Sequence, residues 1–311
     1  MNRVPSAVAG AVRLADWGVI RAHGEDAAAF LHGQLTQDIE HLDAEHARLA
    51  GYCSPKGRLL ASFIVVRPAA DELLLACSAD LLPSTLKRLS MFVLRARCKL
   101  TDATSSHEVW GLAGDPAAGW LATAAPGAAW QRRRLGDGSV VRLPDGGQTS
   151  RFLLLQPAGA TPPALPALDA QTWAWLEAQS AVARIVAATA DRFVPQMLNY
   201  ELVGGVDFRK GCYPGQEVVA RSQYRGTIKR RAMLFDTDAS AQPGDEVFHA
   251  DDPAQPAGLV ANVGVGPDGS TSALVEVKLA AVQSSTLHLR ASDGPVLRLA
   301  RLPYALPADT D

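Results

Sequence analysis

Apolar and polar positions alternate with two different periods along this chain, and the change of period separates predicted helices from predicted strands. Residues 26–35 carry apolar side chains at helical spacing, and acidic Glu25 precedes them at the end where a helix dipole favours negative charge. We expect an amphipathic helix here that ends near Gly33. His32 is expected on its surface.

A continuous apolar run at residues 59–66 is followed by a turn and a second run at 73–77, which is the pattern of a β-hairpin. After it, Ser84 is a candidate N-cap for a helix whose apolar face continues to Val93. A half-exposed strand is expected next, because three cations alternate there with apolar residues: Arg95, Arg97 and Lys99.

The second half of the chain repeats this mixture of elements. Apolar runs between turn-rich segments predict short strands at 109–112, 140–143 and 152–156. A Pro- and Ala-rich loop at 157–166 precedes an apolar stripe that predicts a helix over 171–190. Five more strands are predicted at 231–235, 258–265, 273–277, 286–290 and 296–299. They suit a β-barrel of roughly 80 residues, so the pattern as a whole predicts an α+β fold.

Composition narrows the class of protein. The 311 residues are 48% hydrophobic and 20% charged, which allows a substantial core, and the net charge of −2 gives no global attraction to nucleic acid. The apolar patch at 8–12 is too short for a signal or membrane segment. The cysteines form no CxxC pair, which argues against a disulfide framework or zinc site and favours a cytoplasmic location: Cys53, Cys77, Cys98 and Cys212. Walker, HExxH and GxSxG motifs do not occur.

Residues 208–221 hold the densest chemistry of the chain. Gly211 and Gly215 allow a sharply bent loop around Cys212, and the flanking Lys210 and Arg221 would favour a thiolate if their side chains converge on the sulfur. Cys212 is therefore the candidate functional thiol. The alternative is a small buried hydrophobe in an ordinary turn, which is the commoner fate of a single cysteine.

The segment KGCYPGQE at 210–217, followed by VAR at 219–221, resembles the signature of the YgfZ family of folate-binding, aminomethyltransferase-like proteins. The resemblance extends over nearly the whole chain. Further segments that are similar to the family lie at 33–38 (GQLTQD), 53–58 (CSPKGR), 193–199 (FVPQMLN) and 204–206 (GGV).

This resemblance implies an aminomethyltransferase (GcvT-like) fold, in which two interwoven α/β subdomains and a C-terminal β-barrel surround a central cavity. We expect the α/β region at 1–228 and the barrel at 229–311. The implied cofactor is tetrahydrofolate or a related reduced folate. Together with Cys212, the implied site comprises six cofactor-binding residues: Lys210, Tyr213, Gln216, Glu217, Arg221 and Asn199. The implied role is accessory, in assembly or repair of iron–sulfur clusters, with tRNA-thiolating enzymes as client partners.

Two departures from the family pattern qualify these expectations. Ala61 and Ser62 stand where glycine-cleavage aminomethyltransferases carry paired aspartates, and neither can hold a carboxylate near a substrate amine. Val186 aligns with a position where relatives place a Glu that binds the pterin edge, so folate affinity would be weakened or supplied by another residue.

Cations crowd the motif and the segment after it: Arg209, Lys210, Arg221, Arg225, Lys229, Arg230 and Arg231. They could hold the glutamate tail of a folate or contact RNA phosphate. For the run 229–231 we expect a solvated strand edge instead.

Three functions stay open at this point: a folate-linked accessory factor, a folate-dependent aminomethyl- or methyltransferase, and an RNA-binding module. The missing aspartates disfavour the transferase. The absence of an RNA motif with interleaved aromatic residues disfavours direct nucleic-acid binding. The accessory factor is the favoured hypothesis.

Overall fold

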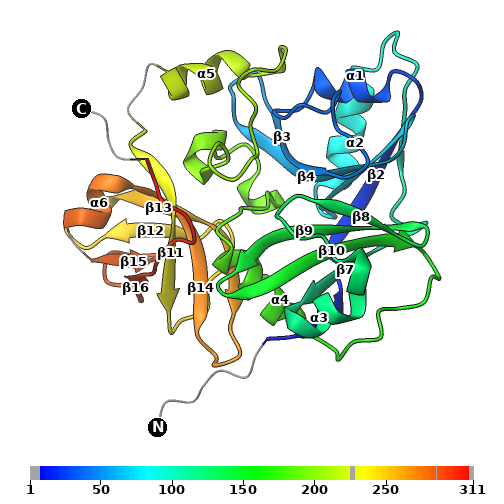
Figure 1. Cartoon of the computed structure of the whole chain (residues 1–311). Coiled ribbons are helices and arrows are strands. Elements are labelled where there is room, and N and C mark those ends of the chain that lie inside the picture. Colours follow the sequence, from blue (N-terminus) through cyan, green and yellow to red (C-terminus); the bar gives the residue numbers. More distant parts are fainter. Residues whose placement is uncertain (1–7, 225–227, 285, 308–311) are drawn as a thin grey trace.

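The computed structural model describes residues 8–224, 228–284 and 286–307, which form two five-stranded antiparallel sheets and a closed barrel (Figure 1). The first sheet has the order β3 (Ala47–Cys53), β4 (Leu59–Ala69), β5 (Glu72–Ser78), β2 (Trp17–His23) and β6 (Lys99–Asp102). The second has the order β1 (Gly10–Arg13), β7 (His107–Ala113), β10 (Thr149–Pro157), β9 (Gly138–Gly146) and β8 (Arg132–Leu135). Because β1 joins the second sheet before β2–β6 build the first, the two α/β subdomains are interwoven, as predicted.

The two sheets share an apolar layer and are covered on their outer faces by helices. Ile64 and Val66 of β4 lie in the shared layer, whereas Phe63 and Val65 face the opposite core, which also contains residues of α1 (Ala27–His32) and α2 (Leu82–Ser90). Successive side chains of a strand point to opposite faces. A strand that is covered on both faces therefore needs apolar residues at nearly every position, which explains the unbroken run at 59–66.

The outer face of the second sheet packs against α3 (Gly114–Leu121), and α4 (Ala170–Gln179) connects this sheet to the barrel. The barrel has the strand order β11 (Arg230–Thr237), β14 (Thr271–Lys278), β13 (Asp252–Val265), β12 (Glu246–His249), β15 (Leu287–Leu289) and β16 (Val296–Leu299), with α6 (Leu279–Ser284) after β14. Contact with α4 is close: a Cβ placed on Gly264 of β13 would lie 2.0 Å from the backbone nitrogen of Trp175. Only glycine allows this approach of strand and helix.

Most predicted elements are confirmed. α1 begins after Asp26 and ends at His32, directly before Gly33. The hairpin corresponds to β4 and β5, and the predicted strands of the second sheet lie within β7, β9 and β10. The barrel is closed, and its strand β12 had no predicted counterpart. The domain boundary between 228 and 229 stays a prediction.

Three local predictions are wrong. Ser84 lies inside α2 and its hydroxyl donates to the carbonyl of Leu81, while Met91 and Phe92 lie beyond the helix and are exposed. Arg95 and Arg97 precede β6 rather than belonging to it. Arg97 is instead held by ion pairs with two acidic residues before and at the start of α1, Glu25 and Asp26.

The predicted helix over 171–190 ends at Gln179. Ala181 adopts a left-handed backbone conformation (φ 52°), which a continuing right-handed helix excludes. The apolar residues after it still reach the core, because Ile185 is buried from an extended segment. Burial rather than helical geometry therefore explains the later part of the stripe.

Among the described residues, no helix is long and apolar enough to cross a membrane. The same residues include no group of three or more His, Cys, Asp or Glu side chains arranged to hold a metal ion.

Candidate functional site

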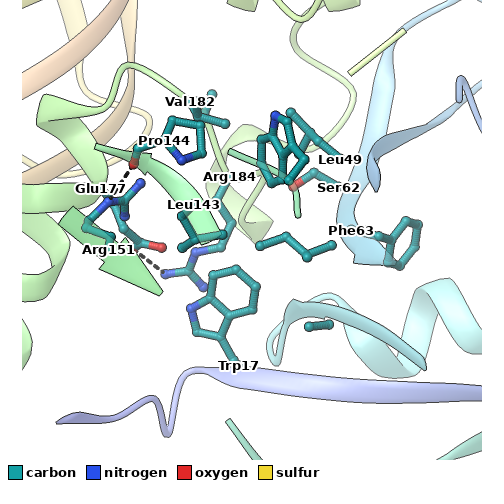
Figure 2. Close-up of a pocket in the computed structure, with 14 residues that line it drawn as sticks. Trp17, Leu49, Ser62, Phe63, Leu143, Pro144, Arg151, Glu177, Val182 and Arg184 are labelled. Carbon is teal, nitrogen blue, oxygen red and sulfur yellow. Dashed lines mark hydrogen bonds and ion pairs between the residues drawn. The ribbon is translucent and has the colours of Figure 1, made fainter. Parts of the chain in front are cut away.

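A cavity of about 40 Å³ lies at the junction of the two sheets and the end of α4 (Figure 2). We call it the central cavity. Its walls come from both sheets, α4 and the segment after α4: Trp17, Leu49, Ser62, Phe63, Ile64, Ala76, Trp130, Leu143, Pro144, Arg151, Glu177, Val182, Ala183 and Arg184. This volume accommodates a few water molecules. Any larger ligand requires side chains of the wall to move.

Charged groups meet at one wall of the central cavity. Glu177 of α4 has a side chain only 12% exposed, and its carboxylate lies 3.7 Å from the guanidinium of Arg184. Burial raises the pKa of Glu177, while the positive charges of Arg184 and Arg151 act in the opposite direction. Burial also lowers the pKa of Arg151, to about 10, which leaves this guanidinium charged at neutral pH. The cavity therefore has a buried acceptor flanked by two cations.

Arg184 is fixed by further contacts. Its guanidinium lies 4.9 Å from the ring centroid of Trp17 and donates to the carboxylate of Asp16 at 2.5 Å. Burial alone would lower the pKa of Arg184, but Glu177 and Asp16 outweigh it and raise the pKa. The Nε–H of Arg184 and the indole N–H of Trp17 are buried and have no hydrogen-bond partner among the described residues. Buried donors normally have partners, so these two are available to a ligand.

Neither departure noted in the sequence places a carboxylate in this cavity. Ala61 is fully buried in the core, and Ser62, which lines the cavity, accepts a hydrogen bond from the backbone of Ile185 at 2.9 Å. Val186 does not line the cavity; its backbone N–H is held by the Thr189 hydroxyl at the start of the short helix η2 (Ala187–Thr189). The carboxylate in the wall of the cavity is that of Glu177.

The central cavity adjoins a larger open depression, which we call the outer groove. Its inner part has a volume of about 450 Å³ and shares Leu143, Pro144 and Val182 with the cavity wall. Its outer part, of about 680 Å³, shares Gly147, Pro303 and Tyr304 with the inner part and is lined mainly by the C-terminal segment 300–306. Leu143, Pro144 and Val182 therefore stand between the central cavity and the groove, which opens to the surface.

The Cys212 motif forms a separate feature, where three segments that are distant in sequence meet. Thr36 donates to the carbonyl of Gly205 at 2.6 Å, and the Gln37 amide donates to the carbonyl of Gly204 at 2.8 Å. Lys210 donates to the carbonyl oxygens of His32 and Leu35, at the end of α1 and just beyond it. The segment 33–38 therefore holds the start of the motif in place.

Lys210 is partly buried in this arrangement. Burial lowers its pKa to about 8, against the opposing charges of Asp38 and Asp207, and its ammonium lies 4.9 Å from the ring centroid of Tyr213. His32 was expected on the helix surface, but its side chain is only 15% exposed and hydrogen bonds to Asp38 at 3.0 Å. That prediction is wrong, because the motif loop covers this end of α1.

The segment 53–58 supports the other end of the motif. Gly57 and Gly215 both have positive φ angles, of 70° and 79°. A Cβ on Gly215 would lie 2.4 Å from the Ser54 carbonyl oxygen, and one on Gly57 would lie 2.8 Å from the Cβ of Val218. Two constraints therefore demand glycine at both positions: the positive φ angle and the close approach of the two loops.

Cys212 differs from the other cysteines in its surroundings. It is exposed on the loop, whereas Cys53 and Cys77 are buried and Cys98 is partly covered. Burial raises the pKa of the Cys53 and Cys77 thiols to about 12 and also raises that of Cys98. Cys212 is thus the accessible thiol among the four.

The remaining predicted site residues lie near this loop or inside the core. Gln216 and Glu217 open α5 (Gln216–Tyr224), where Glu217 forms an exposed ion pair with Arg221 at 2.7 Å. Tyr213 is buried in the main core. None of these four residues lines the central cavity or the outer groove. The same is true of Lys210, Cys212 and Asn199. Their role in cofactor binding stays a prediction.

Asn199 instead belongs to a buried network between the α/β region and the barrel. Its side chain donates to the carbonyl of Ala232 and to the hydroxyl of Tyr304, and accepts from Arg231. Arg231 also pairs with Glu201 at 2.7 Å, with both side chains less than 10% exposed.

The expected solvated edge at 229–231 is therefore wrong for Arg231, and Arg230 pairs with the buried Glu276 of β14. Arg225 lies outside the described residues.

Sequence reasoning missed Glu177, Arg151 and Arg184 as site residues. The available signal was the carboxylate of Glu177 on a helix that also carries Trp173 and Leu176. A buried acid on such an apolar face requires a charged or hydrogen-bonding partner. Arg151 and Arg184 gave no such signal, because only folding brings β10 and the segment after α4 beside Glu177.

Comparison with known proteins gives relatives for the whole chain. The tRNA-modifying protein YgfZ of Sodalis glossinidius is 30% identical, with 95% of this chain and 93% of that protein covered. Those of Serratia proteamaculans (29% identical; 95% and 92% covered) and Yersinia pseudotuberculosis (28%; 96% and 93%) are similar. No protein-family model matches.

Among solved structures, the glycine cleavage system aminomethyltransferase T of Bartonella henselae superposes with a TM-score of 0.71 at 19% identity. The superposition covers 96% of this chain and 86% of that one. The predicted aminomethyltransferase-like fold is confirmed.

Proposed function

Because this chain belongs to the YgfZ family, we propose that it is a folate-binding accessory protein in the modification of tRNA. More specifically, it supports the assembly or repair of iron–sulfur clusters in tRNA-thiolating enzymes. The relatives are named tRNA-modifying proteins, and the fold is that of an aminomethyltransferase. Binding of the folate and contact with the client protein are assigned to two separate parts of the molecule.

The observation that carries folate binding is the set of buried polar groups in the central cavity. A pterin ring presents N–H donors and ring acceptors along one edge. Glu177 offers an acceptor, and Arg184 and Trp17 offer buried donors without partners among the described residues. A neutral ligand with both kinds of group satisfies these side chains, whereas an apolar one would leave them unsatisfied.

Size sets the condition for binding. A cavity of about 40 Å³ is smaller than a pterin, and Leu143, Pro144 and Val182 separate it from the outer groove. Entry of the ring therefore requires movement of these residues, with the ring passing between the sheet and the segment after α4. When bound, the folate would supply one-carbon chemistry. The residues of the chain bind and orient it and exclude water.

Cys212 serves the accessory role at the surface. Its loop is anchored to α1 through Lys210 and to the segment 53–58 through Gly215, so the thiol is presented from a shaped loop rather than a free tail. An exposed thiol can reach a partner protein, which a thiol inside the cavity could not. We assign to Cys212 the transient contact with the client.

Calorimetric titration with tetrahydrofolate tests the cavity assignment. Glu177→Gln keeps the shape of the side chain but replaces the charged acceptor, and we expect an affinity loss of roughly 10- to 100-fold, as for a hydrogen bond to a charged group. Glu217→Gln is the matched control, because Glu217 is an exposed acid of the motif. Its affinity should equal that of the unmodified protein.

Two outcomes would contradict the proposal. If the unmodified protein gives no heat with millimolar reduced folates, it is not a folate-binding protein. If Glu217→Gln weakens binding and Glu177→Gln does not, the folate binds at the motif as the sequence predicted, and the central cavity has another use.

A further inference from the structure

Three large apolar side chains are exposed directly after α2. Met91 is 68% exposed, Phe92 47% and Leu94 85%. We call these three side chains the α2 patch. Single exposed apolar residues are common on protein surfaces, whereas apolar side chains that are exposed together mark sites of interaction. Three of them within four residues therefore indicate a contact surface.

The loop that carries the α2 patch has a fixed shape. The backbone N–H groups of residues 91–94 all donate to carbonyl oxygens of residues 87–92, at 3.0 to 3.3 Å. Further along, the N–H of Arg97 donates to the carboxylate of Asp26 at 2.7 Å. A Cβ on Gly24 would collide with the carbonyl oxygen of Arg97, so the loop lies directly against the start of α1. A loop fixed at both ends loses little conformational entropy when it binds a partner.

The charges around the α2 patch are mixed, with cations in excess. Lys87 and Arg88 in the last turn of α2 and Arg95 beyond it are exposed, and none has an acidic partner in the part of the chain that the structure describes. Glu25 and Asp26 add carboxylates at the start of α1. A lipid bilayer or an RNA backbone presents negative charge throughout and would be repelled by these carboxylates. A protein surface can match both signs, so the pattern favours a protein partner that is mainly acidic around an apolar centre.

α1 connects the α2 patch to the Cys212 motif. The loop of the patch is attached to the start of α1 at Asp26, and the motif covers the other end, where Lys210 donates to the carbonyl of His32. α1 and α2 lie at the same end of the molecule (Figure 1). The six residues of α1 span about 9 Å. A standard protein interface covers a surface roughly 30 Å across, so one partner can contact the patch and Cys212 together.

We propose that the α2 patch is the docking surface for the client protein that Cys212 contacts, and that the client presents an apolar pocket edged by acidic side chains. This inference rests on the proposed accessory function, and it adds where the client binds and which chemistry its surface has. Docking at the patch supplies the affinity and holds the client beside the thiol. The transient contact at Cys212 then needs no strong binding of its own.

The test measures binding of the full chain to a purified tRNA-thiolating iron–sulfur enzyme by biolayer interferometry. We expect the double variant Phe92→Ser with Leu94→Ser to bind roughly tenfold more weakly or worse, because two apolar side chains no longer leave water in the complex. Arg95→Glu should weaken binding roughly three- to tenfold at low salt, and the effect should shrink as salt is raised.

The matched controls lie on the barrel and just beyond it. Leu299→Ser changes a leucine of β16 that is 55% exposed, and Arg301→Glu changes an exposed arginine that has no acidic partner among the described residues. Both should leave the affinity for the enzyme unchanged. Thermal unfolding of each variant, followed by circular dichroism, should match that of the unmodified chain, because every changed side chain is exposed.

The outcomes separate the inference from the proposed function. If the unmodified chain binds the enzyme and the double variant binds it equally well, the inference is overturned and the client contact stands. If the unmodified chain does not bind the enzyme, both are overturned. Phosphatidylserine vesicles, tRNA and sedimentation of the chain alone test other occupants of the patch. Loss of vesicle binding, of tRNA binding or of self-association in the double variant, with binding of the enzyme retained, overturns the inference.

Discussion

The two parts of the proposed function are assigned to two residues at different depths in the molecule. Glu177 is buried at the wall of the central cavity beside two arginines, and Cys212 is exposed on a loop that lines neither the cavity nor the groove. The first environment suits recognition of a small polar ligand, and the second suits contact with another macromolecule. Function therefore has to be tested separately at each residue.

Alkylation tests Cys212. With a small reagent at neutral pH, we expect Cys212 to react at least tenfold faster than Cys53 and Cys77, because burial both hides those thiols and raises their pKa to about 12. Mass spectrometry of the labelled peptides gives the four rates. Lys210→Met, which removes the anchor of the loop, shows whether the rate depends on loop shape.

The biological role of the thiol is checked in a strain that lacks its own homologue, by measuring thiolated tRNA. Cys212→Ser should restore less thiolation than the unmodified chain, with Cys98→Ser as the matched control. If Cys212→Ser restores thiolation fully, or if Cys212 reacts no faster than the buried cysteines, the thiol has no functional role and the motif matters for its backbone and cations.

At the scale of elements, β11 joins the barrel to the α/β region through a buried ion pair. Arg231 of β11 reaches Glu201 and Asn199, in the segment before the motif. Burial raises the pKa of Glu201, and Arg231 opposes this effect. The pair favours a single position of the barrel against the α/β region, because a displaced β11 would leave both charges buried and unpaired.

We expect Arg231→Met to lower the free energy of unfolding by about 3–5 kcal/mol, because it leaves the Glu201 carboxylate buried without a partner. Denaturant titration measures this loss. The double variant Arg231→Met with Glu201→Met should recover most of it, since apolar side chains replace both charges. Arg298→Met, an arginine of β16 in an exposed pair, is the control and should change stability little. A small effect of Arg231→Met would mean that solvent reaches Glu201.

At the scale of the whole molecule, an aminomethyltransferase fold surrounds a cavity that lacks aminomethyltransferase carboxylates at the expected place. Ala61 is buried and Ser62 is used as a hydrogen-bond acceptor for the backbone of Ile185. The fold alone therefore does not imply the reaction of the solved relative.

We expect no glycine-cleavage activity. Reconstitution with a lipoyl carrier protein and tetrahydrofolate, with a glycine-cleavage aminomethyltransferase run in parallel, should release no ammonia above background, because positions 61 and 62 offer no carboxylate for the substrate amine. Release of ammonia that depends on the carrier protein would refute this, and would direct attention to Glu177 as the acting carboxylate.

The local sequence pattern was enough to predict an element wherever residues that are close in sequence are also close in space. The hairpin β4–β5, helix α1 and most strands of the barrel follow from alternation and turn residues, and the motif identified the family. The predicted continuation of the helix after Gln179 was wrong. Apolar spacing reports burial, and it does not reveal that Ala181 has a left-handed backbone conformation.

The sequence by itself determined the fold class, the family and the choice of Cys212 as the thiol to test, since these depend on short-range pattern and on residue type. Only the tertiary structure decided which charges are paired and which are free. Arg151, Glu177 and Arg184 meet because two sheets and a helix end at one point, and Arg231 is buried because the barrel closes over it. The electrostatic role of a side chain depends on distance and desolvation, and both are set by residues far away in the chain.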